Sequence, residues 1–432
     1  MSNILNLNYR MIVSRFYFIF LLITFTSSLV KAQGSSTINL NEIKATCTSY
    51  NDIISSSCLD SIVSIIGKKT IIGLGEGTHG TKEFNIVRTA ISKRLIEEEG
   101  FNYICFENNY GETFLFNMKL NKGQPIESLL KKHFIGIYQT PELLDFFNWL
   151  SIYNRRNNDA VKVSGLDFFE LSATCEILKN QIINIEGYSL ELNRLSENIA
   201  IQDSLRNHQL TNHELFKTAT LNAYKILNRL NEDEFLQIRD IVLFKEAFFN
   251  LMVRNEFYYQ AYQNPENASL DRDYGMASML KFIRMRDPKA KIIILAHNTH
   301  ISKHYVFGKG KNGGGMGGYI EAFFPNEYIA LATTTSKGTF SVTKDIYPTR
   351  FNQFMIQKLP STTKESIERL FNNKYTSALY NITNEEKLGK VYMMFPGFQY
   401  SPNYTPNFEI VIQDYFDVLY HLPKTQAAIH IN

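Results

Sequence analysis

The chain has 432 residues, of which 44% are hydrophobic and 13% aromatic, and its formal net charge is +3. This composition is typical of a globular protein with a sizeable core. Arg10, Arg15 and Lys31 account for the net charge, so the sequence after residue 32 is balanced and offers no basic surface for nucleic acid.

The first 32 residues have the pattern of a secretory signal peptide. Two arginines precede the apolar run Phe16–Phe25, and Val30-Lys31-Ala32 supplies the small residues of a cleavage site. The apolar run is shorter than the roughly 20 residues that span a bilayer. We therefore expect an exported protein, periplasmic or secreted, with no stable membrane insertion once residues 1–32 are removed.

Residues 42–66 are predicted to form one or two helices, and they contain two of the four cysteines. Cys47 and Cys58 could pair in an oxidising compartment. Cys105 lies in an apolar strand pattern and Cys175 in a helical one, which predicts two buried free thiols. Neither the number nor the spacing of the cysteines indicates a zinc cluster.

Strands and helices alternate after residue 70. The apolar runs Thr70–Leu74, Tyr103–Phe106, Val161–Gly165 and Lys291–Ala296 predict buried strands, and stretches with helical spacing separate the first three. Near-continuous apolar strands joined by helices are typical of a parallel sheet that is covered on both faces. We therefore predict an α/β fold whose mostly parallel sheet carries helices on both faces.

Long amphipathic patterns with little glycine fill residues 171–286, which predicts an inserted, cap-like helical region. The expected organisation is a signal peptide at 1–32, an α/β hydrolytic core at 33–170 and 287–432, and this insertion. A glycine-rich loop, Gly308–Gly318, is long enough to close over a site.

Ionisable side chains follow four of the predicted strands. Because the carboxyl ends of parallel strands lie on one edge of the sheet, these side chains should converge there. A histidine beside a carboxylate is suited to general base catalysis, since the carboxylate orients the ring and raises its basicity. The convergent set could activate and hold a water molecule, and its members are Glu76, His79, Glu107, Asp167, His297 and His300.

Two other interpretations compete for this set. Residues 75–80 match the G-x-G-x-x-G pattern of dinucleotide-binding turns, but Glu76 would place a carboxylate against the pyrophosphate. The histidines and carboxylates could instead bind a divalent ion, although His297 and His300 do not form a specific zinc motif. We predict neither cofactor nor metal.

Asp167 could equally be the N-cap of a helix beginning at Phe168. The sequence contains no G-x-S-x-G nucleophile motif, and the cysteines lack the electropositive setting of a reactive thiol. The residues therefore favour direct attack by water without a covalent intermediate.

The ordered set of motifs resembles the erythromycin esterase family. Gly75–Gly80, followed by Glu83-Phe84 and Arg88, is similar to that family's G-E-x-[ST]-H-G-x-x-E-F stretch. Further segments agree in order and content over most of the chain after the leader: Phe106-Glu107, Asn148-Trp149-Leu150, Tyr153-Asn154, Gly165-Leu166-Asp167, Arg272-Asp273, Met276-Ala277, Ala296-His297-Asn298, His300, Met316-Gly317, Asp417 and Ile429-His430-Ile431.

The resemblance implies an α/β core with a helical insertion and a metal-independent hydrolase that opens a macrolactone ester. His79 matches the family's water-activating base and Glu76 its partner carboxylate. We accordingly predict a carboxylic ester hydrolase acting on a small-molecule ester, with a macrolide lactone and hence antibiotic resistance among the candidates. The predicted catalytic residues are His79, Glu76, Glu107 and His297, and the predicted substrate-binding residues are Arg88, His300 and Asp167. The alternative is an exported, non-catalytic or metal-binding protein that holds a glycan or other small molecule in the same cleft.

Overall fold

The computed structural model describes residues 44–158, 160–263, 272–304, 315–362, 366–371, 375–383, 389–400 and 407–431. The predicted signal peptide and residues 308–314 of the glycine-rich loop lie outside these ranges. Within them, no helix combines the length and the apolar character needed to cross a membrane.

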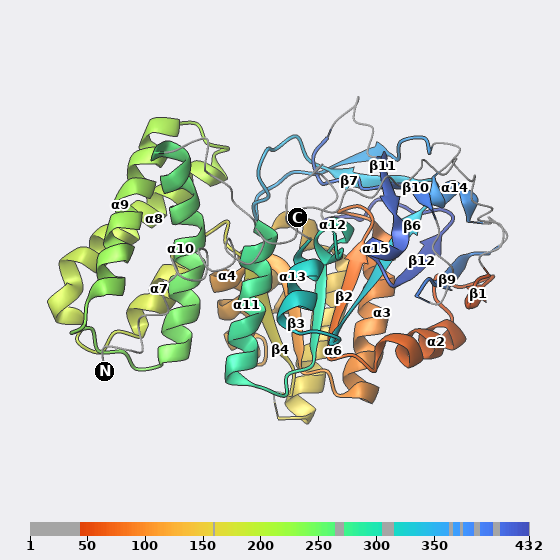
Figure 1. The fold of residues 1–432 in the computed structure, drawn as a ribbon, viewed down its shortest axis with the longest axis horizontal. Coiled ribbons are helices and arrows are strands. Elements are labelled where there is room, and N and C mark those ends of the chain that lie inside the picture. The colour runs from red at the N-terminus through yellow and green to blue at the C-terminus, as the bar shows by residue number, and fades with distance from the viewer. Residues whose placement is uncertain are drawn as a thin grey trace, which may run out of the picture.

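An eight-stranded sheet forms the centre of the molecule (Figure 1). The strands from β12 to β4 are parallel, whereas β9 runs antiparallel to both β12 and β1. This architecture confirms the predicted α/β class with a mostly parallel sheet. In spatial order the strands are β1 (Cys47–Ser49), β9 (Ser377–Asn381), β12 (Val418–Leu422), β6 (Tyr328–Thr335), β2 (Ile71–Glu76), β5 (Ile292–His297), β3 (Tyr103–Asn109) and β4 (Lys162–Asp167).

The central strands β2, β5 and β3 are apolar up to their carboxyl ends, because both faces of the sheet are buried there. Successive side chains of a strand point to opposite faces. In β5, Ile292 and Ile294 accordingly join one hydrophobic cluster, while Ile293 and Leu295 join the other.

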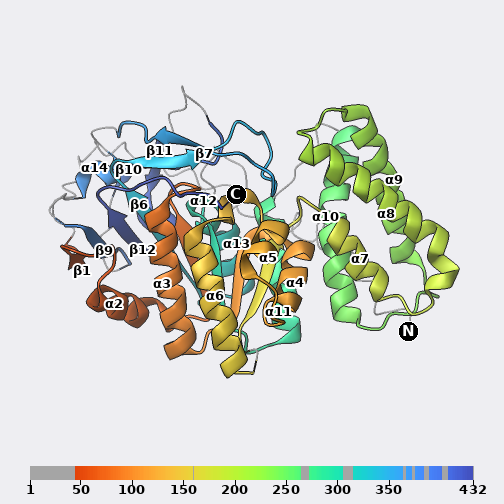
Figure 2. The ribbon, with the colours of Figure 1, turned by 180° about the vertical axis from the view of Figure 1, so that it is seen from behind.

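Helices cover both faces of this sheet (Figures 1 and 2). One face packs against α2 (Ser56–Ile66), α3 (Lys82–Glu99) and α6 (Pro141–Arg156), and the other against α11 (Arg272–Arg286) and α13 (Met316–Phe323). The helix α3 ends at Gly100, which adopts the left-handed conformation with φ +69° and donates its N–H to Leu95.

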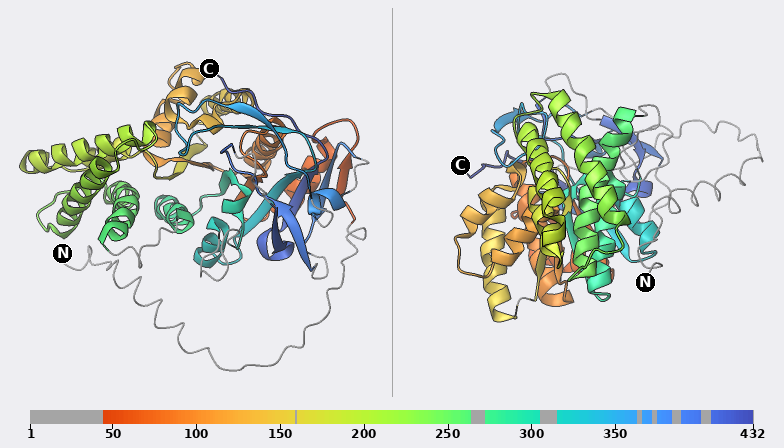
Figure 3. Two further views of the ribbon diagram at one scale, coloured as in Figure 1. Left: turned by 90° about the horizontal axis from the view of Figure 1, so that it is seen from above. Right: turned by 90° about the vertical axis from the view of Figure 1, so that its left-hand side faces the viewer.

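Three long helices stand together beside the α/β part (Figure 3, left). They are α8 (Ser189–Asn207), α9 (His213–Glu232) and α10 (Ile241–Gln263), and α7 (Ser172–Asn180) joins them to the edge strand β4. The predicted insertion, residues 171–286, contains these helices and also α11, which packs on β4 and α13.

The remaining elements are short. Two small antiparallel sheets, β7 (Thr339–Val342) with β8 (Met355–Lys358) and β10 (Lys390–Met394) with β11 (Asn407–Val411), lie above the carboxyl ends of the central strands (Figure 1). The others are α4 (Tyr110–Lys119), α5 (Ile126–His133), α12 (Asn298–Ile301), α14 (Ile367–Leu370), α15 (Ile412–Tyr415) and the 3-10 turns Gly136–Tyr138 and Ile185–Tyr188.

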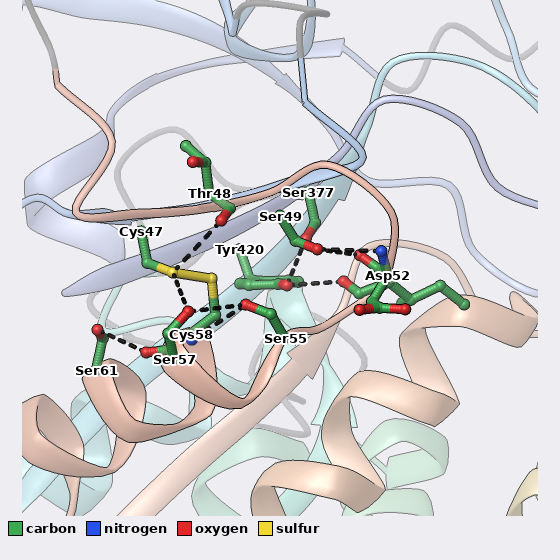
Figure 4. Close-up of a disulfide and its surroundings, with 11 residues drawn as sticks. Cys47, Thr48, Ser49, Asp52, Ser55, Ser57, Cys58, Ser61, Ser377 and Tyr420 are labelled. Carbon is green, nitrogen blue, oxygen red and sulfur yellow. Dashed lines mark hydrogen bonds between the residues drawn. A yellow bond between two sulfur atoms is a disulfide. The ribbon is translucent and has the colours of Figure 1, made fainter.

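The structure corrects the prediction of one or two helices at residues 42–66: within the described part of this range, from residue 44 onward, α2 is the only helix. Cys47–Ser49 is instead the strand β1, because it pairs with β9 from the far end of the chain. A disulfide joins Cys47 to Cys58, with the two Cα atoms 5.4 Å apart, and so ties β1 to α2 (Figure 4). Cys105 and Cys175 are buried free thiols, as the sequence predicted.

Candidate active site

The turn between β2 and α3 is fixed by its glycines and by contacts from distant parts of the chain. Gly80 has φ +75°, and a Cβ placed there would lie 1.9 Å from Oγ of Ser341, so a side chain is excluded at this position. The carbonyl of Gly80 accepts the backbone N–H groups of Ser341 at 3.0 Å and of Ala428 at 2.8 Å. The turn that carries Glu76 and His79 is therefore held from two directions.

A histidine near the chain's end extends this clamp. Nδ1 of His430 lies 2.9 Å from the carbonyl oxygen of Gly136, to which it must donate. Nε2 of the same ring is then an acceptor, 2.6 Å from Oγ of Ser341. Burial lowers the pKa of His430 to about 4, so the neutral ring that this pair of bonds requires is the stable form near neutral pH.

Glu76 orients His79 through one carboxylate oxygen. Oε1 of Glu76 lies 2.9 Å from Nδ1 of His79, while Oε2 accepts Nη2 of Arg88 at 2.7 Å. A carboxylate only accepts hydrogen bonds, so the proton of neutral His79 resides on Nδ1 and the lone pair on Nε2. Arg88 is 1% exposed and also donates to Asn85 at 2.6 Å, which places it behind Glu76.

His297, at the end of β5, lies against His79 with a ring-centroid distance of 4.7 Å. Its Nε2 donates to the carbonyl of Pro396 at 3.1 Å, and its Nδ1 accepts from the hydroxyl of Thr299 at 2.9 Å. Burial, followed by the charge of His79, lowers the pKa of His297 well below its usual value. His297 is thus a neutral ring with both nitrogens engaged, an arrangement that favours positioning over proton transfer.

Glu107, at the end of β3, connects His297 to a second group of charges. Its Oε2 accepts the backbone N–H of His297 at 3.1 Å, and its Oε1 accepts Nη2 of Arg272 at 2.8 Å. Burial alone would raise the pKa of Glu107, but the positive charges of His300 and Arg272 outweigh burial and hold this pKa well below its usual value. Glu107 is therefore a buried carboxylate anion.

Asp167 is fully buried at the end of β4 and accepts Arg272 through both carboxylate oxygens, at 3.3 Å from Nε to Oδ1 and 2.5 Å from Nη2 to Oδ2. It also accepts the N–H of Phe168 at 2.9 Å. The helix expected to begin at Phe168 begins only at Ser172, so Asp167 does not cap it.

His300 is held between two carboxylates. Its Nδ1 lies 2.6 Å from Oδ1 of Asp273, and its Nε2 lies 3.3 Å from Oε1 of Glu107. Burial would lower the pKa of His300, but Glu107 and Asp273 raise it to about 10, so the ring is an imidazolium near neutral pH. Nη1 of Arg272, 3.0 Å from Nε2, is then a like-charged neighbour, and both cations share Glu107.

The structure thus brings all seven predicted site residues to one edge of the sheet. They form two groups, one around Glu76 and one around Glu107, which meet where the rings of His79 and His297 are in contact. Arg272 and Asp273, at the start of α11, complete the second group and were not predicted as site residues. The family-like segment Arg272-Asp273 was their only signal, because an acidic residue in a first helical turn is otherwise an ordinary dipole contact.

The charges of this site are nearly balanced, and its cations are more exposed than its carboxylates. Four carboxylates face two guanidinium groups and one imidazolium, which leaves one negative charge when His79 is neutral. The side chains of Arg272 and His300 are 24% and 15% exposed, whereas those of Glu107 and Asp167 are 5% and 0% exposed. Cations therefore lie at the open side of the site, above buried carboxylates. In the described part of the chain, no group of three His, Cys, Asp or Glu residues is arranged to hold a metal ion.

Comparisons with known proteins identify the family of the chain. The family model for erythromycin esterase matches residues 96–425. Erythromycin esterase type II of Escherichia coli is 23% identical over 310 residues, which is 66% of this chain and 72% of that protein.

Solved structures share the fold at low sequence identity. A succinoglycan biosynthesis protein has a TM-score of 0.70 at 18% identity, over 93% of this chain and 100% of the other. A mutant of the erythromycin esterase EreC in its open conformation has a TM-score of 0.67 at 18% identity, over 88% and 97%. The chain belongs to the erythromycin esterase family and is a hydrolase of that family, which confirms the resemblance found in its sequence.

Proposed function

We propose that the protein hydrolyses a carboxylic ester by direct attack of a water molecule that His79 activates. The observation that carries the proposal is the bond from Nδ1 of His79 to Glu76, which leaves the lone pair on Nε2. A neutral imidazole held in one tautomer by a carboxylate is a general base suited to neutral pH. Arg88 fixes the other oxygen of Glu76 and so maintains the orientation.

The remaining residues have roles that follow from their charges. Attack of water on an ester carbonyl places negative charge on the carbonyl oxygen, and fixed cations stabilise that charge. Arg272 and His300 are the cationic groups at the open side of the site. Glu107 keeps His300 protonated and holds the backbone of His297 in place. We assign Glu107 and His297 to positioning, and Arg272 and His300 to the carbonyl oxygen.

A substrate panel tests this proposal. Purified protein would be assayed with macrolides, simple aryl esters and acylated glycans, in parallel with a His79→Asn variant and with chelator present. We expect turnover of at least one ester class that survives chelator and is lost in the variant. Hydrolysis that persists in His79→Asn would overturn the mechanism, and binding of a glycan without turnover would favour the non-catalytic alternative.

We also propose that the protein acts outside the cytoplasm. The leader pattern of residues 1–32 and the disulfide between Cys47 and Cys58 support this, because disulfides persist in oxidising compartments. Cell fractionation together with N-terminal sequencing tests it. A mature chain that begins at Gln33 in an extracytoplasmic fraction is the expected result, and an intact leader on cytoplasmic protein would refute it.

A further inference from the structure

A buried arginine beside the active site has no counter-ion of its own among the residues that the structure describes. Arg206, on α8, is 3% exposed, and Nη2 of its guanidinium finds no hydrogen-bond partner among the residues that the structure describes. The group lies 4.5 Å from the ring centre of Phe169 and 4.4 Å from that of Tyr347. A buried cation without a counter-ion is costly to the folded state, because the interior does not replace its hydration.

The neighbouring charges do not compensate Arg206. Asp203, three residues before Arg206 on α8, accepts the backbone N–H groups of Leu171 at 2.9 Å and Ser172 at 2.7 Å. It also lies 3.7 Å from Nη1 of Arg254, a second buried cation. Burial, and then the charge of Arg254, lowers the pKa of Arg206 to about 10, so that Arg206 remains charged near neutral pH. The other acidic groups near these arginines are Glu170, which binds Arg350, and Asp167, which binds Arg272, so each is already paired with another arginine.

Phe169 connects this region to the catalytic residues. Its ring centre lies 4.5 Å from the guanidinium of Arg206 and also 4.5 Å from that of Arg272. Arg272 in turn binds Glu107 and Asp167 in the active site. The ring of Phe169 thus contacts both guanidinium groups, which places Arg206 next to the active-site residue Arg272.

We propose that Arg206, stacked between Phe169 and Tyr347, is a subsite for an anionic group of the substrate, a carboxylate or a phosphate. The planar guanidinium matches such oxyanions through paired hydrogen bonds, and aromatic faces hold it in a fixed plane. The identification of the ligand as a hydrolysed ester rests on the proposed function. The binding of the anion is independent of the proposed function, because binding needs no turnover.

Equilibrium binding tests the subsite independently of hydrolysis. Calorimetry would compare trigalacturonic acid, the neutral trisaccharide of galactose, and inorganic phosphate on wild-type protein and on Arg206→Gln. We expect the wild type to bind an anionic probe at least about tenfold more tightly than the neutral one, and Arg206→Gln to lose this preference. Preference for trigalacturonic acid assigns the subsite to a carboxylate, and preference for phosphate assigns it to a phosphate group. Equal binding of charged and neutral probes by the wild type, or an anion preference that Arg206→Gln retains, would overturn the proposal.

Two further variants separate binding from folding. Arg206→Met replaces the unpaired cation with an apolar side chain of similar length, so its melting temperature should equal or exceed that of the wild type while anion binding is lost. A merely structural arginine would show the opposite, a lower melting temperature with unchanged binding. Arg194→Gln removes an exposed charge from the same helix and should leave binding unchanged. His79→Asn should also retain anion binding, so a failure of the esterase mechanism and a failure of the subsite give different results.

Discussion

The two oxygens of Glu76 bind two different partners: Oε1 lies 2.9 Å from Nδ1 of His79, and Oε2 lies 2.7 Å from Nη2 of Arg88. The arginine fixes the carboxylate in place, and the carboxylate keeps the proton of neutral His79 on Nδ1. The basicity of His79 therefore depends on a residue whose own side chain is buried behind the site.

Glu76→Gln should inactivate the enzyme while leaving the fold intact. The amide can donate to Nδ1 of His79, which moves the ring proton to Nε2 and removes the lone pair that accepts a proton from the attacking water. We expect kcat to fall by roughly 10³-fold or more, as for tautomer-fixing carboxylates in other hydrolases. Steady-state kinetics on the best ester of the panel measures the change, with circular dichroism as the control for folding. A kcat of the variant within threefold of the wild-type kcat would show that Glu76 does not set the tautomer of His79.

His430→Ala should lower kcat with little change in KM. The substitution removes the acceptor of Ser341, whose backbone holds the carbonyl of Gly80 next to His79. Small displacements of a catalytic group commonly cost about tenfold to a hundredfold in rate. His430→Gln, which can still donate and accept, should restore most of the activity. If both variants lose activity equally and melt at lower temperature, the clamp serves stability alone.

Glu368→Gln should change how the stability of the protein depends on pH. Glu368 is 1% exposed, and burial raises its pKa to about 7 from the usual 4.5. Below pH 4.5 the group is protonated in both folded and unfolded chains, so its burial does not lower the free energy of unfolding. As the pH rises to 7, the carboxyl group of Glu368 ionises in the unfolded chain before it ionises in the folded one. The free energy of unfolding of the wild type therefore falls by on the order of 3 kcal/mol, and that of the glutamine variant does not.

Denaturant unfolding at pH 5 and pH 8 measures this difference. The advantage of Glu368→Gln over the wild type should be larger at pH 8. Because Oε1 of Glu368 accepts the N–H of Met394 at 2.8 Å, a carbonyl oxygen must remain there, and Glu368→Ala is the control that lacks it. An advantage that does not grow with pH would mean that Glu368 ionises normally in the folded protein.

Removal of the disulfide should destabilise the amino-terminal edge of the sheet. Cys47 and Cys58 are separated by 11 residues, and closing a loop of this size restricts the unfolded chain by roughly 3 kcal/mol. Cys47→Ser should lower the free energy of unfolding by up to that amount, with turnover of substrate unchanged because the site lies elsewhere on the sheet. Reduction of the wild type should reproduce the loss. Equal stability of oxidised wild type and variant would contradict the expectation.

The sequence could predict the convergence of the site because it depends on local patterns. Apolar runs such as Lys291–Ala296 identify parallel strands, and the first polar residue after each run must lie at the shared edge. Arg272 could not be assigned in this way, since it begins a helix and reaches Glu107 only through packing. The strand at Cys47–Ser49 was missed for a similar reason, because its partner β9 lies more than 300 residues further along the chain.

The role of His297 illustrates a second limit. Its place at a strand end indicated a site residue, and the structure puts its ring against that of His79. Only the positions of Pro396 and Thr299 show that both nitrogens are engaged. Residue type and spacing can place a side chain, but its protonation state depends on neighbours from distant segments.

The strand order also governs when the site can form during synthesis. β5 lies between β2 and β3 in the sheet, although the ribosome produces it after the whole helical insertion. Until β5 emerges, β2 and β3 cannot occupy their final positions, and each presents an edge of unpaired backbone N–H and C=O groups on a largely apolar strand. Nascent chains that stop short of residue 297 should therefore be prone to aggregation and depend on chaperones, because non-local strand pairing exposes such edges during folding.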